Sequence, residues 1–205
     1  TVSSGDFTLG TNANLNSGSH AGGISLSSNK TFYFNASADH TLSGAIAGTD
    51  ASVVKQGDAT LTLSGNNTYT GSTSVVSGNL SITGGQSRSD AFAVSGGAVL
   101  EFNVGADFVA ATDGAFPGAS VFWGSDPVTW SGAGTIRKSG SGLFGISTTG
   151  ADVWELGAGA LIDIQEGRLN FGWSYNDDFS DNLATLNVAD GATLDYWDAK
   201  LEFST

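Results

Sequence analysis

Alternation of apolar and small polar residues, broken at intervals by glycine, is the feature that most constrains the fold of this chain. It is clearest over residues 54–80, where Leu61 and Leu63 are each flanked by threonine or serine, and it resumes toward Leu80 and Ile82. A period of two residues places successive side chains on opposite faces of a β-strand. The pattern therefore predicts short strands that turn through glycine.

The composition supports a folded, strand-rich chain. Its 205 residues include 30 glycines but only 2 prolines, and 12 Phe, 5 Trp and 4 Tyr supply material for a core, which argues against a disordered linker. The absence of cysteine excludes disulfides, thiolate catalysis and cysteine-based zinc sites. We find no apolar run of 18 residues, so we expect no membrane-spanning segment.

The net charge of the chain limits the kinds of molecule that it can bind. Twenty acidic and 7 basic side chains give a formal charge of −13. Such a chain repels a phosphate backbone, so we expect no nucleic acid partner. The excess of acids is consistent with an exposed, soluble surface or with binding of divalent cations.

Residues 54–80 also resemble the autotransporter-associated β-strand repeat. The resemblance is carried by a series of matching positions: Lys55, Gly57, Thr-Leu-Thr-Leu-Ser-Gly at 60–65, Asn-Thr-Tyr at 67–69, Gly71, Gly78 and Leu80. This repeat is found in secreted bacterial passenger regions. The resemblance implies an all-β fold, a right-handed parallel β-helix (β-solenoid), and a location outside the cell or on the bacterial outer surface.

Further units of the same kind extend along the chain, so we expect a single β-solenoid domain spanning 1–205. Glycine-then-leucine units recur at about 20–25 residues, a period typical of solenoids, whose coils bury their inward faces only by stacking. Two stretches, near 105–127 and 173–182, break the rhythm and are predicted to be irregular excursions. We expect ten apolar residues to form inward ladders: Leu61, Leu63, Leu80, Ile82, Leu100, Phe102, Ile162, Ile164, Leu169 and Phe171.

The second excursion contains a candidate calcium site. Asp177, Asp178 and Asp181 place several hard oxygen donors in one short loop, together with Asn182. The glycine of an EF-hand loop is missing, because Leu183 follows Asn182. The alternative is a solvated turn that is capped by its own aspartates. No other cofactor is expected.

All five tryptophans lie in the second half of the chain. Exposed aromatic rings stack on sugars, so Trp123, Trp173 and Tyr175 are candidates for a glycan-binding groove. The alternative is that the large aromatic residues of this half fill or cap the solenoid core, where each buries about 150–250 Å².

The sequence offers little for catalysis. His20 and His40 have no acidic or serine partner at a recognisable spacing, so both are interpreted as surface residues. The Asp177–Asp178 pair resembles the paired aspartates of polygalacturonases, but the His-Gly and Arg-x-Lys elements of those enzymes are absent. Two carboxylates alone do not make a glycosidase, because acid and base must flank one bond at a defined separation. We therefore expect no enzyme.

Lys55 and the Arg137–Lys138 pair occupy the recurrent lysine position of the repeat. They are predicted to lie at the outer edge of a coil near carboxylates of adjacent coils, where exposed ion pairs contribute about 0–1 kcal/mol.

Taken with the resemblance, these features predict a structural or adhesive extracellular segment. Its partners would be other copies or neighbouring chains joined by strand stacking, into a stalk or fibre, with surface glycans or cell-surface receptors as further candidates. The competing interpretation is a carbohydrate-binding or polysaccharide-active β-helix that uses the Trp-rich second half.

Overall fold

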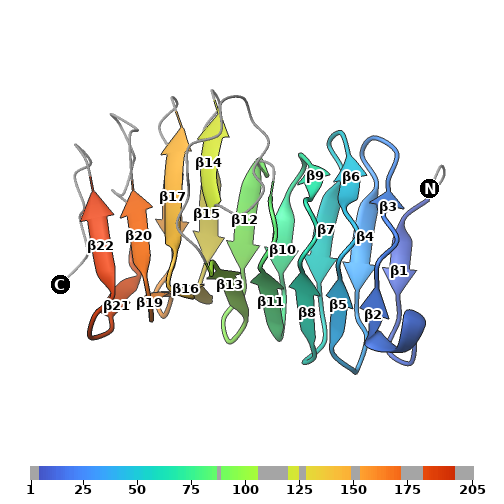
Figure 1. The fold of residues 1–205 in the computed structure, drawn as a ribbon, viewed down its shortest axis with the longest axis horizontal. Coiled ribbons are helices and arrows are strands. Elements are labelled where there is room, and N and C mark those ends of the chain that lie inside the picture. Colours follow the sequence, from blue (N-terminus) through green and yellow to red (C-terminus); the bar gives the residue numbers. More distant parts are fainter. Residues whose placement is uncertain are drawn as a thin grey trace.

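The structure is a computed structural model, which describes residues 5–86, 89–105, 120–124, 128–148, 153–171 and 182–196. Its strands run side by side along one elongated stack, from the N-terminal end to the C-terminal end of the molecule (Figure 1). The strand pairs between successive coils are parallel. The predicted fold class, a parallel β-solenoid, is confirmed.

Within the described residues, the strands form four sheets. The seven-stranded sheet contains β1 (Phe7–Leu9), β4 (Thr31–Phe34), β7 (Ser52–Lys55), β10 (Thr73–Val75), β12 (Ala91–Val94), β15 (Thr129–Gly132) and β18 (Val153–Leu156). The eight-stranded sheet contains β2 (Ser19–His20), β5 (His40–Leu42), β8 (Thr60–Leu63), β11 (Asn79–Ile82), β13 (Val99–Asn103), β16 (Thr135–Ser139), β19 (Leu161–Ile164) and β21 (Thr185–Val188).

The third side of the solenoid is made by two separate sheets. The first contains β3 (Ile24–Ser25), β6 (Ile46–Gly48) and β9 (Thr68–Tyr69), and the second contains β14 (Ser120–Gly124), β17 (Leu143–Thr148), β20 (Arg168–Phe171) and β22 (Thr193–Tyr196). A single bridge between Asn67 and Gln86 continues the first of them into the next coil. The structure also describes a short 3₁₀ turn, η1 (Asn16–Gly18).

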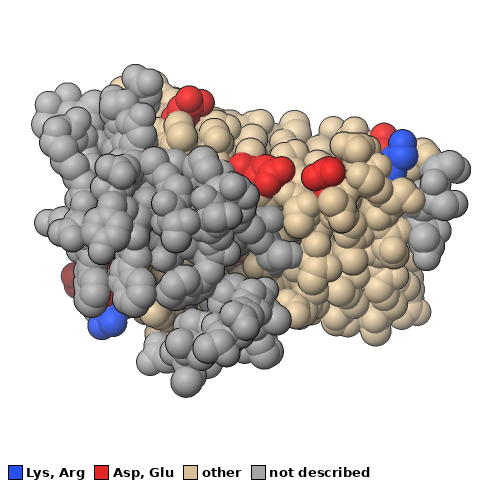
Figure 2. Space-filling view, turned by 90° about the horizontal axis from the view of Figure 1, so that it is seen from above, with Lys and Arg blue, Asp and Glu red and all other residues tan. Residues whose placement is uncertain are grey.

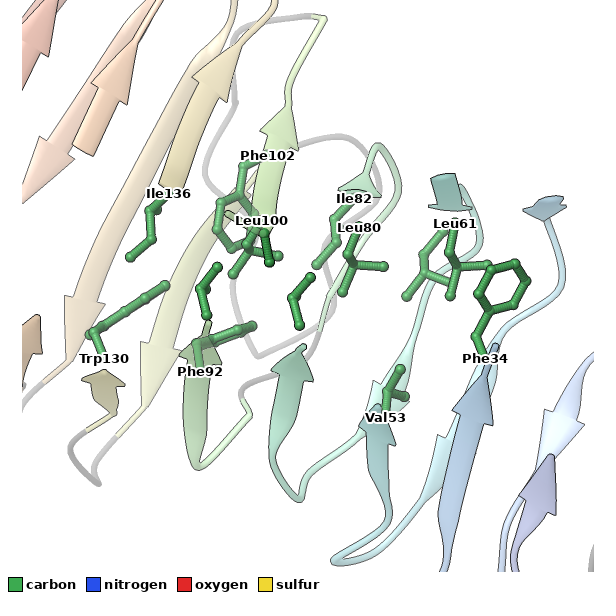
Figure 3. Close-up of a cluster of buried hydrophobic side chains, with 14 of the residues drawn as sticks. Phe34, Val53, Leu61, Leu80, Ile82, Phe92, Leu100, Phe102, Trp130 and Ile136 are labelled. Atoms are coloured by element: carbon green, nitrogen blue, oxygen red, sulfur yellow. The ribbon is translucent and has the colours of Figure 1, made fainter. Parts of the chain in front are cut away.

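The core lies between these sheets and is built from the alternation seen in the sequence. Leu61, Leu80, Leu100 and Ile136 occupy matching positions on successive strands of the eight-stranded sheet. Side chains from this sheet and from the seven-stranded sheet point toward one another in the interior (Figure 3). Nine of the ten predicted ladder residues are buried, and the side chain of the tenth, Phe171, lies outside the description.

The excursion predicted near 105–127 contains a regular strand. Residues 120–124 form β14, which pairs in parallel with β17. Alternation in this segment is weak, because Ser-Val-Phe-Trp-Gly carries three consecutive large apolar residues. Most of the excursion predicted at 173–182 lies outside the described residues. Among the residues described, no helix has the length and hydropathy needed to cross a membrane.

Candidate functional site

The candidate calcium ligands Asp177, Asp178 and Asp181 lie outside the described residues, so the calcium site stays a prediction. Asn182, at the edge of that loop, is described and faces inward with 2% of its surface exposed. Its side-chain oxygen accepts a hydrogen bond of 3.0 Å from the backbone N–H of Ala184. Asn182 therefore caps the backbone of its own turn and does not present its oxygen to solvent. Elsewhere, in the parts that the structure does describe, no three His, Asp or Glu side chains cluster as metal ligands.

The candidate glycan residues Trp173 and Tyr175 also lie outside the described residues, and Trp123 is described only through the backbone of β14. Two other tryptophans of this half are core residues: Trp130 and Trp154 are 0% and 1% exposed. Their rings stack with centroids 4.9 Å apart, and Trp130 stacks in turn on Phe92 at 4.6 Å. For these two tryptophans the core interpretation is confirmed.

Lys55 is the last residue of β7, and its buried side chain bonds to the turn where the chain leaves this strand; we call this arrangement a lysine corner. Its side chain is 0% exposed, and Nζ donates hydrogen bonds to three backbone oxygens, those of Gln56 at 3.0 Å, Gly57 at 2.7 Å and Ser77 at 3.0 Å. Two of these oxygens belong to its own turn and the third to the next coil, so the ammonium group joins two coils. Nζ also lies 5.6 Å from the centre of the Phe34 ring, within cation–π range.

Lys138 repeats this corner at the end of β16. It is 2% exposed, and Nζ donates to the backbone oxygens of Ser139 at 2.7 Å, Gly140 at 2.6 Å and Glu166 at 3.1 Å. Lys55 closes a strand of the seven-stranded sheet, whereas Lys138 closes a strand of the eight-stranded sheet. The same local motif therefore serves two different corners of the solenoid.

The prediction that these lysines lie at the outer edge near carboxylates is wrong. Each lysine side chain points inward near the end of its strand, where backbone oxygens of the following turn lie within reach. These oxygens accept hydrogen bonds from the ammonium group, so it can remain buried. Burial lowers the pKa of Lys55 and of Lys138 to about 8, and nearby carboxylates (Asp58 and Asp39, and Glu166, respectively) act in the opposite direction. The signal in the sequence was the recurring Lys-x-Gly, at Lys55 and at Lys138.

Arg137 points outward, as predicted for this pair. Its Nε lies 2.9 Å from Oδ2 of Asp163 on the next coil, and Asp163 also accepts hydrogen bonds from Gln165 at 3.0 Å and Asn187 at 2.7 Å. Burial raises the pKa of Asp163, but hydrogen bonds from Asn187, Arg137 and Gln165, with the charge of Arg137, outweigh it and leave the pKa lowered. Both oxygens of this carboxylate are thus engaged in holding adjacent coils together.

The interpretation of His40 as a surface residue is wrong. Its side chain is 2% exposed and contacts the edge of the Phe34 ring at a centroid distance of 5.3 Å. Nδ1 lies 2.8 Å from the backbone oxygen of Ala38, and Nε2 accepts a hydrogen bond of 3.1 Å from the N–H of Leu15. His40 pairs with Leu61 in the register, so it fills a ladder position where other coils carry leucine. His20 is half-buried.

Residues 53–82 match the family model described as passenger-associated-transport-repeat. The matched segment extends from β7 to β11 and contains the Lys55 corner. No significant match was found among curated proteins or among solved structures. The chain thus carries an autotransporter passenger repeat, and this repeat forms part of a continuous stack of parallel strands.

Proposed function

We propose that the chain is a non-enzymatic structural or adhesive part of an autotransporter passenger, displayed on the outer surface of a bacterium. The observation that carries this proposal is the passenger repeat at 53–82, which lies in register with coils on both sides of it. The description of the matched family links the repeat to the transport of passengers, and this supports a location outside the cell.

The use of the polar side chains supports a structural role. Lys55, Lys138 and His40 are buried and bonded to backbone groups, and Asp163 accepts hydrogen bonds from three side chains. Groups held in this way stabilise the contacts between coils. A catalytic acid or base must instead be free to exchange a proton with a substrate.

Assembly through the ends of the stack is the mode of interaction that we propose. In the described residues, β1 and β22 each pair with a strand on one side. Val188, on the last described strand of the eight-stranded sheet, is 41% exposed. An unpaired strand with apolar side chains is a template for addition of another strand.

Immunolabelling of cells that make the full-length protein tests the location. Antibodies against this chain should label intact cells, and external protease should remove the signal. Labelling that requires permeabilised cells would contradict the proposal. A glycan array with the purified chain separates a structural segment, which gives no saturable signal, from the competing carbohydrate-binding role of Trp123, Trp173 and Tyr175.

Sedimentation of the purified chain tests the assembly. Val188→Lys should abolish polymers, because a charge at the terminal strand disfavours strand addition. Thr62→Lys, an outward substitution in the middle of the stack, should leave them unchanged. Polymers held by main-chain bonds should persist in salt, whereas assembly through a calcium-loaded acidic loop should dissociate in chelator. A monomer under all conditions would leave a stalk segment without self-assembly.

A further inference from the structure

We propose that His40 is an acid-sensitive latch that holds the first turn of the solenoid against the coil that follows. The two hydrogen bonds of the ring, its burial and the backbone conformation of the turn that it holds support this role, whatever the function of the whole chain.

The two partners of the ring define its protonation state. The backbone oxygen of Ala38 only accepts hydrogen bonds, so Nδ1, at 2.8 Å from it, must carry a proton. The N–H of Leu15 only donates, so Nε2, at 3.1 Å from it, must be free of one. Both bonds exist together only in the neutral ring with its proton on Nδ1.

A second proton would break this arrangement. An N–H at Nε2 would face the N–H of Leu15, and the positive charge would lie at a side chain that is 2% exposed. Once the Leu15 segment moves away, water can solvate the charged ring. Protonation of His40 is therefore coupled to opening of this contact, and acid favours the open state.

The carboxylate of the preceding residue, Asp39, is engaged by the next coil, because its Oδ1 accepts a hydrogen bond of 2.7 Å from the N–H of Thr60. The ammonium of Lys55, which lies 5.6 Å from the centre of the Phe34 ring, carries a charge of the same sign as a protonated His40. Within the described chain, the titratable or charged residues on the elements and turns around His40 include His20 on β2, Tyr33 on β4, Asp39, Lys55 and Asp58.

The segment that the latch holds is poised to move. Asn16 and Ser17 have φ of 49° and 55°, in the left-handed region that residues other than glycine rarely adopt. Among the hydrogen bonds that the structure describes for residues 12–18, the Leu15–His40 bond is the one that reaches another coil. Ala13 and Leu15 pack against the core, so opening exposes apolar surface at this end of the solenoid.

Hydrogen exchange of the full chain, measured by mass spectrometry and corrected for intrinsic rates, tests the latch. Between about pH 7.5 and about pH 5, protection of residues 12–18 should fall about tenfold, while β8 and β11 stay protected. His40→Gln keeps an acceptor for Leu15 without a titrating ring and should abolish this acid dependence. His20→Gln is the matched control and should behave as the unmodified chain. Equal acid dependence in His40→Gln, no loss of protection in the unmodified chain, or a loss shared by β8 would overturn the proposal.

A second measurement needs no variant. Long-range ¹H–¹⁵N NMR correlations of the histidine rings at neutral pH should show His40 as the neutral tautomer with its proton on Nδ1. A proton on Nε2 would overturn the proposal even if His40→Gln failed to fold.

Discussion

At the scale of single residues, position relative to the interior decides what a substitution does. Leu63 is 0% exposed, whereas its neighbour Thr62 faces the other side of the same strand and is half-buried. Leu63→Asp should lower the free energy of unfolding by about 3–5 kcal/mol or prevent folding, because the core holds no partner for the charge. Thr62→Asp should cost about 1 kcal/mol or less. Equal shifts in thermal denaturation would show that the face assignment is wrong.

The lysine corner provides a second test at this scale. Lys55→Met keeps the aliphatic stem but leaves the oxygens of Gln56, Gly57 and Ser77 without their donor. We expect a loss of about 2–4 kcal/mol in the free energy of unfolding, measured by denaturant titration. Lys30→Met, at a half-buried lysine, is the control and should change stability by about 0.5 kcal/mol or less. Similar losses in the two variants would contradict the proposed contribution of the corner.

The ionisation of the Asp163 carboxyl makes the free energy of unfolding depend on pH. Its pKa is lowered in the folded chain, so the carboxylate contributes stability above its ordinary pKa of about 3.9, and this contribution is lost as the pH falls through the folded value. The stability difference between the unmodified chain and Asp163→Asn should therefore be largest near neutral pH and shrink below about pH 4. Denaturant titrations over this range measure it, and a difference that stays constant would contradict the account.

At the scale of elements, the close approach of adjacent turns makes glycine necessary at particular corners. Gly78 has φ of +68°, and a Cβ there would lie 2.4 Å from the oxygen of Gly57 and 2.7 Å from Nζ of Lys55. Gly97 has a similar φ of +82° but open space around it. Gly97→Ala should cost about 1–2 kcal/mol from its backbone conformation alone. Gly78→Ala should lower the free energy of unfolding by several kcal/mol more, because the two coils must separate to admit the methyl group. Equal shifts of the two variants in thermal denaturation would show that the turn at Gly78 tolerates a side chain.

Alternation predicted the strands and the inward ladders because the two faces of a strand see different surroundings. Ile162 and Ile164 could be assigned from sequence, since isoleucine at every second position has one stable orientation in a solenoid. Polar residues at inward positions could not be assigned in this way. His40 and Lys138 are buried because backbone groups of neighbouring turns satisfy them, and these groups are brought close only by the stacking of coils.

The second Lys-x-Gly segment shows a related limit. Lys138 matches the entry of the repeat in sequence, yet it closes a strand of a different sheet from Lys55. The local sequence therefore predicts the turn that follows each lysine but not the sheet to which the lysine belongs. The candidate sites in the acidic loop and at Trp173 remain predictions, because their residues lie outside the described structure.

At the scale of the whole molecule, acidic side chains greatly outnumber basic ones. Figure 2 shows acidic side chains spread along one face, with basic side chains sparse in its described part. With a net charge of −13, such a face repels other copies laterally.

The described strands form one continuous parallel stack, and a distance measured along this stack provides a direct check. Thr8 and Glu155 are joined by an unbroken register through Tyr33, Val54, Ser74, Ala93 and Ser131 on the outer side of the seven-stranded sheet. Because the chain has no cysteine, spin labels can be attached at Thr8→Cys and Glu155→Cys alone.

Six steps of about 4.8 Å place the two backbone positions about 29 Å apart. Pulsed electron paramagnetic resonance should therefore give one narrow distance distribution near this value, broadened only by the label side chains. A broad distribution, or one centred beyond about 40 Å, would show that the coils do not form a single stack in this register and would contradict the account.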